Sequence, residues 1–249
     1  MPNLIDTHCH LEEIKNLDSV IEKAKSVGVI AIIAVGSDYQ SNRRILFDIA
    51  PKYEGFVFPA LGYHPGELKL SEIADNLKFI ENSIKEAVGI GEIGLDYKKD
   101  IKKSVSVDLQ KSVLRRLLAI AKRDQKPVII HSRYAWQDTF DLVKESGVEK
   151  AVFHWYSGTS SVRRKIIEGN YFLSANPAAE YSREHREAIK DASLDRLLLE
   201  TDSPVRDWEP ADVLKSLNAV AELKNLSQEE IAQITTDNAI KFFDLPLKL

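Results

Sequence analysis

The sequence predicts an α/β fold, and two observations indicate that its strands close into a (β/α)8 barrel. Eight short apolar runs alternate with charged, amphipathic segments from one end of the chain to the other. The chain has 249 residues, and eight strand–helix units in about 250 residues are typical of such a barrel. An open, doubly wound sheet is the alternative, because it also satisfies a strict strand–helix repeat.

The predicted strands are short and rich in Val, Ile, Leu and Phe. Such runs are typical of parallel strands that are buried on both faces, and they are too short for surface helices. In chain order they span Leu4–Asp6, Val29–Val35, Phe56–Leu61, Ala87–Ile93, Val128–Ile130, Lys150–Phe153, Tyr171–Leu173 and Arg196–Leu199.

The segments between these runs have the pattern of surface helices. Asp18–Val27 begins with an acidic capping residue and ends before Gly28, which favours a helix over that range. Asp108–Lys126 carries an apolar stripe and an opposite basic face, and Pro127 ends it because the residue before a proline avoids the α region. The stripe consists of Leu109, Val113, Leu117, Ile120 and Ala121, and the basic face of Arg115, Arg116, Lys122 and Arg123.

Composition and charge exclude several classes of protein. Hydrophobic residues make up 44% of the chain and charged residues 29%, an ordinary globular mixture rather than a disordered one. The formal net charge of −4 argues against a protein that coats nucleic acid through bulk positive charge. It does not exclude a nucleic-acid enzyme whose metal supplies positive charge. No apolar run approaches the roughly 20 residues of a membrane span, so we expect no membrane association.

The single cysteine and the start of the chain bear on location and organisation. One cysteine cannot form an intrachain disulfide, so a reducing cytoplasm is the expected compartment. The segment Met1–Asp6 reaches a charge after two apolar residues, unlike a signal peptide. Neither a linker nor a break in composition marks a boundary, so we expect one domain over residues 1–249 and see no sign of an obligate protein partner.

Two histidines lie close together at the end of the first predicted strand, in Asp6-Thr7-His8-Cys9-His10. Side chains alternate across a strand, so His8 and His10 project to one face and Cys9 to the other. Two imidazoles at this spacing can bind one cation, whereas the simpler interpretation is a pair of polar strand-end residues. Cys9 is most simply a small buried hydrophobic residue.

Other predicted strands also end in residues that bind metals. His131 and His154 each directly follow an apolar run. Glu92 lies at the end of the predicted strand Ala87–Ile93, and Asp202 follows Leu197–Leu199 closely. The carboxyl ends of parallel barrel strands meet at one rim, where active sites are built. Imidazoles and carboxylates converging there favour a divalent cation between them, and this donor set suits Zn, Mn, Fe or Co better than Ca. The alternative is a coincidence of polar strand ends.

One motif suggests a different chemistry. Gly89–Gly94 matches the G-x-G-x-x-G fingerprint of dinucleotide-binding proteins and follows an apolar run. That fingerprint requires a helix to begin directly, so that its N-terminus meets the pyrophosphate. The charged stretch Leu95–Asp100 follows instead and is expected to be a loop. We therefore interpret the glycines as positions where the backbone crowds close to Glu92.

A series of short motifs in a fixed order carries a resemblance that runs from Leu4 to about Phe243. The motifs are Asp6–Leu11, Gly62–Pro65, Gly91–Tyr97, His131–Arg133, His154–Gly158, Glu200–Pro204, Asn238-Ala239 and Phe242-Phe243. In this order and at these distances they resemble the TatD family of metal-dependent deoxyribonucleases, within the wider amidohydrolase superfamily.

The resemblance implies a distorted TIM barrel with two divalent metal ions, Mg, Mn or Zn, at the carboxyl ends of its strands. It implies that Asp202 is the general base and that Glu92 bridges the two ions as the second catalytic residue. The implied metal ligands are His8, His10 and Asp202 for one ion, and His131 and His154 for the other, with Glu92 shared.

Three further residues have alternative roles. His64 is expected to contact substrate phosphate, unless it is only a loop histidine before Pro65. Arg133 can bind phosphate by a two-pronged hydrogen bond, or it can simply pair with Asp96. Glu200 lies two residues before the presumed base Asp202, and we expect it to support the ligands from behind rather than take part directly.

The sequence also departs from the family pattern at the expected substrate mouth. Lys98–Asp100 stands where apolar or aromatic residues are usual, Leu173–Pro177 lacks a Ser-x-Ser-Gly pattern, and the loop Val205–Pro210 is short. Trp155 or Tyr156 is expected to face the mouth, because both directly follow the predicted ligand at 154. Trp136 is expected to serve packing.

We therefore expect phosphodiester hydrolysis, with single-stranded or end-accessible DNA as the substrate. One alternative keeps the same site but makes the protein a zinc-dependent amide, ester or lactone hydrolase, because a metal-activated hydroxide also attacks carbonyl groups. A second alternative is a binding protein that retains metal without turnover. The predicted base Asp202 argues against it, because binding alone needs no base.

Overall fold

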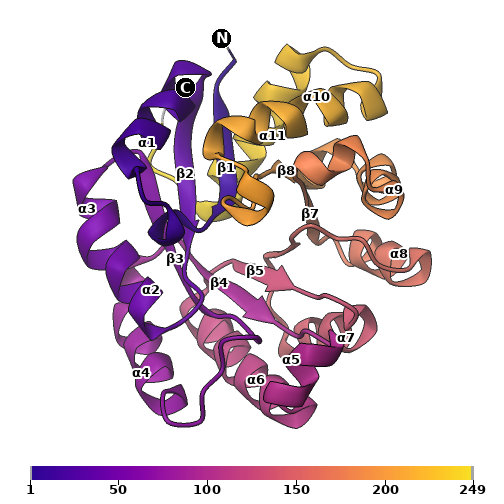
Figure 1. The fold of residues 1–249 in the computed structure, drawn as a ribbon. Helices are drawn as coiled ribbons and strands as arrows, with labels where there is room; N and C mark the ends of the chain where they lie inside the picture. The colour runs from indigo at the N-terminus through magenta and orange to yellow at the C-terminus, as the bar shows by residue number, and fades with distance from the viewer. Residues whose placement is uncertain (1, 248–249) are drawn as a thin grey trace.

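The computed structural model describes residues 2–247 and contains eight parallel strands that curve into a nearly closed barrel (Figure 1). The strands are neighbours in chain order, from β1 to β8, which confirms the predicted barrel and excludes the open, doubly wound alternative. They span β1 (Leu4–Cys9), β2 (Val29–Val35), β3 (Val57–Tyr63), β4 (Gly89–Gly94), β5 (Val128–His131), β6 (Ala151–Phe153), β7 (Phe172–Ala175) and β8 (Leu197–Leu199).

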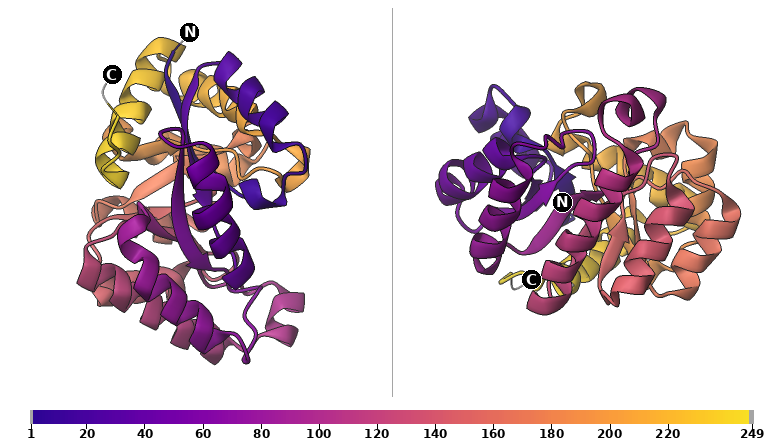
Figure 2. Two further views of the ribbon diagram at one scale, coloured as in Figure 1. Left: turned by 90° about the vertical axis from the view of Figure 1, so that its left-hand side faces the viewer. Right: turned by 90° about the horizontal axis from the view of Figure 1, so that it is seen from below.

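Helices surround the strands, and the two ends of the chain lie on the same side of the molecule (Figures 1 and 2). The chain alternates strand and helix throughout, although α2 and α3 are joined by a π-helical turn, Ile45–Ile49. The helices span α1 (Leu17–Ser26), α2 (Tyr39–Arg44), α3 (Ala50–Lys52), α4 (Ile73–Ser83), α5 (Lys99–Ser104), α6 (Val107–Asp124), α7 (Trp136–Ser146), α8 (Ser160–Glu168), α9 (Arg183–Asp191), α10 (Val213–Lys224) and α11 (Gln228–Phe243).

The predicted elements occur where the patterns placed them, with shifts at their ends. The two predicted helices correspond to α1 and α6, and the basic face of α6 is exposed as expected. Strand β1 continues beyond the predicted end at Asp6 to Cys9, because backbone pairing continues where the side chains become polar. The interpretation of Leu95–Asp100 as a loop is wrong at its end, since α5 begins at Lys99. No helix begins directly after β4, so the glycine-rich run lacks the helix N-terminus that a dinucleotide-binding fingerprint requires.

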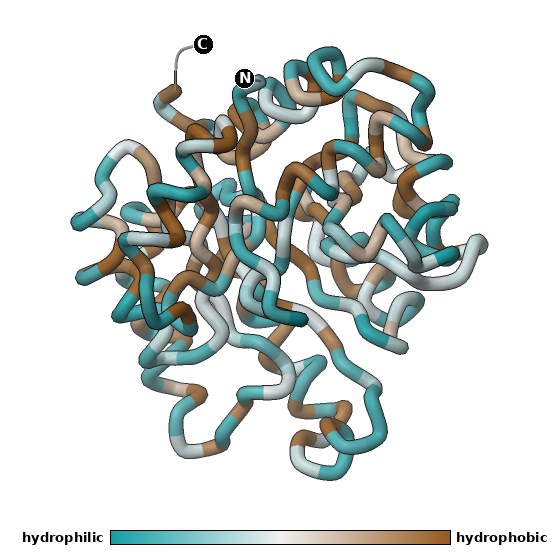
Figure 3. Tube along the Cα trace, turned by 45° about the horizontal axis from the view of Figure 1, so that its top comes forward, coloured by the Kyte–Doolittle hydropathy of each residue, from teal (hydrophilic) through white to brown (hydrophobic). Residues whose placement is uncertain are grey.

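Apolar residues collect in the interior, where hydrophobic stretches run through the middle of the molecule between more hydrophilic outer segments (Figure 3). One buried cluster combines strand residues such as Ile33 and Ile129 with Phe242 and Phe243 at the end of α11. The Phe242 ring lies 4.7 Å from that of Phe172, at the start of β7. The last helix therefore closes the barrel at the amino ends of its strands.

The barrel is least regular between β1 and β8, where side chains complete the closure. A single isolated bridge joins Cys9 to Ser203, beyond the end of β8. The buried Asp6 side chain accepts hydrogen bonds from the backbone N–H (2.9 Å) and hydroxyl (2.6 Å) of Thr201. Thr7 donates its hydroxyl proton to the carbonyl of Leu199 at 2.9 Å. These contacts connect the segment that carries His8 to the segment that follows β8.

A second irregularity lies between β3 and β4, where the pairing register shifts between Leu61 and Tyr63. The side chain of Asn42 accepts a hydrogen bond from the Gly62 N–H at 2.9 Å and donates one to the Gly62 carbonyl at 2.7 Å. Asn42 is completely buried. A buried amide therefore satisfies the two backbone groups of Gly62 where the ladder is irregular.

Within residues 2–247, no helix has both the length and the apolar character that a membrane span requires.

Replacing Asn42 with alanine should destabilise the barrel strongly. The change leaves the buried N–H and carbonyl of Gly62 without their partner, and the free energy of unfolding should fall by about 2–5 kcal/mol. Denaturant unfolding followed by circular dichroism measures the loss. The matched control is Asn82→Ala on the exposed side of α4, which should change stability by no more than about 0.5 kcal/mol. Equal effects for the two variants would contradict this account of Gly62.

Candidate metal centre

The structure brings the six predicted metal ligands together at the carboxyl ends of the strands. His8 and His10 come from the end of β1, Glu92 from β4, His131 from the end of β5, and the remaining two follow β6 and β8. Five of the six are at least nine-tenths buried: His8, His10, Glu92, His154 and Asp202.

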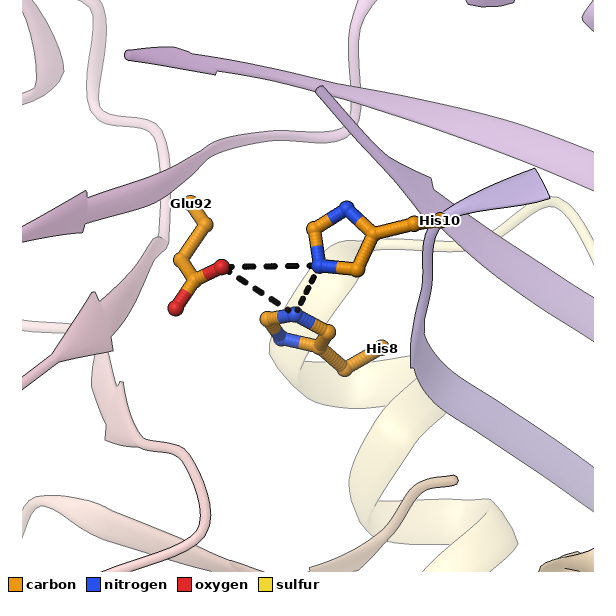
Figure 4. Close-up of side chains that lie close together, drawn as sticks. All are labelled: His8, His10 and Glu92. Atoms are coloured by element: carbon orange, nitrogen blue, oxygen red, sulfur yellow. Dashed lines mark hydrogen bonds and ion pairs between the residues drawn. The ribbon is translucent and has the colours of Figure 1, made fainter. Parts of the chain in front are cut away.

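The two histidines of β1 face the Glu92 carboxylate together (Figure 4). Their Nε2 atoms lie 3.2 Å apart. Oε2 of Glu92 lies 3.6 Å from Nε2 of His8 and 3.5 Å from Nε2 of His10. The predicted projection of both imidazoles to one face of the strand is therefore confirmed, and Cys9 is buried in the core.

The other oxygen of Glu92 faces a second pair of histidines. Oε1 lies 2.6 Å from Nδ1 of His131 and 2.7 Å from Nε2 of His154. These two nitrogens are themselves 3.4 Å apart. One carboxylate thus lies between two pairs of imidazoles, with one oxygen turned toward each pair.

Asp202 completes the first group. Its Oδ1 lies 3.4 Å from Nε2 of His8 and 3.5 Å from Nε2 of His10. The His154 ring stacks on that of His8 with centroids 4.1 Å apart, so the two groups are in contact. The backbone N–H of Asp202 donates to the His8 carbonyl at 2.9 Å, which fixes the segment after β8 against β1.

Hydrogen bonds on the far side of the rings set which imidazole nitrogen faces the centre. His10 donates from Nδ1 to the carbonyl of Val35 at 3.0 Å, so Nε2 is the ring nitrogen that faces Glu92. His131 donates from Nε2 to Asp96 at 3.3 Å, so its Nδ1 lone pair faces the same carboxylate. Such outer hydrogen bonds are typical of histidines that bind metals.

Glu200 supports the centre from behind. It is almost fully buried, and its Oε1 lies 3.6 Å from Nδ1 of His154. The same oxygen accepts a hydrogen bond from the backbone N–H of Trp155 at 3.1 Å. These contacts fix the loop after β6, and with it the ring of His154, which agrees with the expected supporting role of Glu200.

Glycines allow the strands to approach closely around Glu92. A Cβ atom at Gly62 would lie 2.3 Å from the Glu92 nitrogen, and one at Gly94 would lie 1.9 Å from the His131 carbonyl oxygen. Larger residues would push β3 and β5 away from β4. Within the predicted glycine-rich run, Gly94 lets β4 and β5 approach closely, whereas the glycine that lets a neighbouring strand approach Glu92 itself is Gly62, outside that run.

The neighbouring carboxylates raise the pKa of the His154 and His10 imidazoles, because they stabilise the protonated rings. Burial lowers the pKa of His154, but the negative charges of Glu92 and Glu200 outweigh it and hold the pKa well above its usual value. Burial likewise opposes protonation of His10, yet Asp202, Glu12 and Glu92 raise its pKa well above the ordinary range.

The carboxyl groups respond in the opposite sense. Burial raises the pKa of the Glu92 carboxyl, but the positive charges of His154 and His131 and the hydrogen bond with His10 outweigh it, so the pKa falls well below its usual range. Burial also raises the pKa of Asp202, but the hydrogen bond between Asp202 and His10 outweighs burial, so the pKa of Asp202 is lowered overall. Both groups are therefore carboxylates at neutral pH.

These donors fit divalent cations. The Nδ1 lone pair of His131 and the Glu92 oxygen lie 2.6 Å apart, a contact that is favourable only with positive charge between or on them. His8 and His10 bring a second pair of ring nitrogens together, with their Nε2 atoms 3.2 Å apart. Imidazole and carboxylate together suit first-row divalent metals.

The predicted substrate residues lie beside the centre. His64 accepts a hydrogen bond at Nδ1 from the Gly66 N–H at 3.0 Å, so its proton is on Nε2, which lies 4.0 Å from Glu92. Burial lowers the pKa of His64 to about 3, so the ring is neutral. Arg133 pairs with Asp96 through Nε at 2.9 Å, the alternative the sequence left open, and its side chain remains 44% exposed.

A cavity of about 1130 Å³ opens over the centre. Trp155 lines it, whereas Tyr156 is buried and donates its hydroxyl proton to the Thr159 carbonyl, so Trp155 is the residue that faces the mouth. Trp136 packs against the core, as predicted, and also borders the cavity.

Some residues of the site have little signal in the sequence. Asp96 was indicated only as a partner for Arg133, but it also orients His131. Glu12 lies close to the centre, and neither of its buried carboxylate oxygens has a hydrogen-bond partner among the described residues. Tyr134 borders the cavity from a loop where sequence patterns are uninformative. The position of Glu12 two residues after His10 is the one sequence signal that could have indicated it.

Comparisons with known proteins agree with this geometry. The sequence model of the family described as TatD related DNase matches residues 5–244. The chain is 34% identical to deoxyribonuclease TATDN3 of Homo sapiens, over 96% of this chain and 94% of the relative. It is 35% identical to the uncharacterized metal-dependent hydrolase YabD of Bacillus subtilis, over 96% and 98% of the two chains.

Solved structures show the same barrel. YJJV, a TatD homolog from Escherichia coli K12, superimposes with a TM-score of 0.86 at 26% identity and covers 98% of each chain. A dihydroorotase from Campylobacter jejuni shares the fold with a TM-score of 0.68 at 15% identity, over all of this chain and 85% of that one. With the family match over nearly the whole chain, these findings confirm the resemblance read from the motifs: the chain belongs to the TatD related DNase family of hydrolases.

Proposed function

We propose that this chain is a metal-dependent deoxyribonuclease whose site holds two divalent cations with Glu92 between them. The observation that carries the proposal is the arrangement of the Glu92 oxygens. One faces His8 and His10, and the other faces His131 and His154. Family membership and the names of the relatives, which include a deoxyribonuclease, support DNA as the substrate.

In this proposal, His8, His10 and Asp202 hold one ion, His131 and His154 hold the other, and Glu92 contacts both. When bound, two such ions, of the Mg, Mn or Zn type, would supply activation of a water molecule and stabilisation of the attacking and leaving oxygens of an in-line displacement at phosphorus. Asp96 and Glu200 keep the rings of His131 and His154 in place from behind.

Asp202 is the proposed general base. Its carboxylate lies at the cavity surface beside His8 and His10, and its lowered pKa keeps it ionised and able to accept a proton. The attacking water would transfer one proton to this carboxylate as its oxygen bonds to phosphorus, while the bond from phosphorus to the leaving nucleoside oxygen breaks and that oxygen takes a proton from solvent. General bases placed in this way contribute about 10²–10⁴-fold to the rate.

His64 and Arg133 are the proposed contacts to the phosphate. The neutral His64 ring presents its Nε2 proton toward the centre, where a phosphoryl oxygen can accept it. The guanidinium of Arg133 is held by Asp96 and half exposed at the cavity, so its remaining N–H groups can donate to a phosphate. Together they orient the substrate without taking part in bond breaking.

A direct test compares phosphodiester and carbonyl substrates on one preparation. Metal-free protein is given Mg²⁺, Mn²⁺ or Zn²⁺ and then single-stranded DNA, duplex DNA, RNA, or a panel of amides, esters and lactones. Cleavage of DNA that depends on added metal supports the proposal. Intact DNA and RNA with hydrolysis of a carbonyl substrate would instead favour the amide, ester or lactone alternative. Retained metal without any turnover would identify a binding protein.

Asp202→Asn should abolish most turnover while the protein keeps part of its metal. The amide cannot accept the proton, so kcat should fall by about 10²–10⁴-fold. Loss of one ligand should reduce metal content only partly, as elemental analysis measures. The matched control is Asp207→Asn, an exposed aspartate in the same loop, which should retain wild-type activity. Wild-type turnover by Asp202→Asn would refute its role as the base.

Each histidine pair should account for one ion. The wild-type chain should bind two divalent ions, whereas His8→Ala and His131→Ala should each lose occupancy of one while largely keeping the other. Elemental analysis after dialysis against a low, buffered metal concentration gives the count. His185→Gln is the control, because His185 is buried on α9 and bonds to Tyr156 rather than to the centre. A wild-type stoichiometry of one ion would rule out the paired arrangement.

A further inference from the structure

The mouth of the cavity has two unlike halves. The loops after β1, β2 and β3 supply acidic side chains, while the loops after β5, β6, β7 and β8 supply aromatic and arginine side chains. The acidic half contains Glu12, Glu13, Asp38 and Glu67, and the other half contains Arg133, Tyr134, Trp155, Tyr181 and Arg206 together with a single exposed carboxylate, Glu184. A polyanionic substrate is repelled by the first half and attracted by the second.

The aromatic half exposes large side chains to an unusual degree. Tyr134 is 62% exposed and Tyr181 is 56% exposed. Both belong to the small group of strongly exposed large hydrophobic residues within residues 2–247, and both border this cavity. We call Tyr134, Trp155 and Tyr181 the aromatic arc. Exposed aromatic side chains that gather around one cavity indicate a surface for binding.

The backbone beneath this half is held in a conformation that bulky residues rarely adopt. Tyr134 has a φ of 58°, Trp155 of 40° and Arg206 of 57°. Elsewhere, left-handed residues such as Gln125 and Asn225 end helices, where that conformation is common. Tyr134 and Trp155 end no helix. Strain of this kind persists where the surrounding structure fixes a side chain in a particular direction.

Each member of the arc is braced by a neighbour. The Tyr134 ring contacts Trp136 at a centroid distance of 5.8 Å, and Trp155 contacts the buried Trp208 at 5.6 Å. The Arg206 guanidinium lies 5.5 Å from the centroid of the Tyr181 ring. A ring that is already held by a neighbour loses little freedom when a planar ligand stacks on it.

We propose that the aromatic arc stacks the nucleobases next to the scissile phosphate, so that the site takes a single strand with its bases turned outward. This inference rests on the proposed nuclease function. Every base has a flat π-face, and stacking on aromatic side chains beside a positively charged path is how single strands are bound without reading sequence. Arg133 and Arg206 supply that charge on the same half. The strand therefore leaves the metal centre over the loops after β5–β8.

The test compares substrates that differ only in their bases. A short oligothymidylate and an abasic oligonucleotide of equal length carry the same phosphates. Tyr134→Ala and Tyr181→Ala should each raise KM for the oligothymidylate about tenfold, the range expected for loss of one stacking contact. KM for the abasic strand and kcat for both should stay near wild type. Tyr134→Phe keeps the ring and should keep the wild-type KM.

The matched control is Phe47→Ala, which removes an aromatic ring that is 50% exposed and lies outside this cavity. It should leave both KM values unchanged. Equal KM values for wild type and the two tyrosine variants would overturn the proposal, as would an equal rise for the abasic strand. A change in oligomeric state without a change in KM would assign the arc to a protein interface instead and would also overturn it.

Binding separates this inference from the nuclease proposal itself. Fluorescence polarisation of the same labelled strands measures stacking whether or not a strand is cut. Failure of wild-type protein to cleave either strand would defeat the nuclease proposal. The inference about the arc would then still be judged by whether Tyr134→Ala removes the preference for the strand with bases. Absence of any such preference in the wild type would overturn it.

Discussion

The Glu92 carboxylate and the four histidines around it are the interaction on which the rest of the site depends. Its two oxygens lie between two pairs of imidazoles, with one oxygen 2.6–2.7 Å from one pair and the other 3.5–3.6 Å from the second. Buried carboxylates and buried lone pairs at these distances are stable only with compensating positive charge. The centre is therefore stable only when positive charge lies among these groups. The surrounding structure fixes the positions of the groups that create this requirement.

Several features of the barrel serve this arrangement. Gly62 lets β3 approach Glu92, Gly94 lets β5 approach β4, and Asn42 satisfies the backbone of Gly62 where the strand ladder is interrupted. The closure between β1 and β8 relies on Asp6 and on hydrogen bonds to the segment that carries Asp202. The least regular parts of the barrel thus lie at the carboxyl ends of the strands.

The sequence predicted the barrel and the convergence of the ligands because both follow from simple periodicity. Alternation along β1 places His8 and His10 on one face, and parallel strands bring His131 and His154 to the same rim. The ends of strands were harder to predict, since the apolar signal stops where polar residues begin although backbone pairing continues to Cys9. Tyr134 and Tyr181 had no such signal. Their exposure depends on loop conformations with positive φ or on distant packing, which periodicity does not encode.

The central claim is that Glu92 lies between two metal ions. It can be tested by titrating metal-free protein with Mn²⁺ and recording electron paramagnetic resonance spectra. Two ions that share a carboxylate lie about 3.5–4 Å apart in comparable sites, close enough for their spins to couple. The account predicts the spectrum of a coupled pair at two equivalents, and its loss in Glu92→Gln. A spectrum of isolated ions at saturation would contradict it.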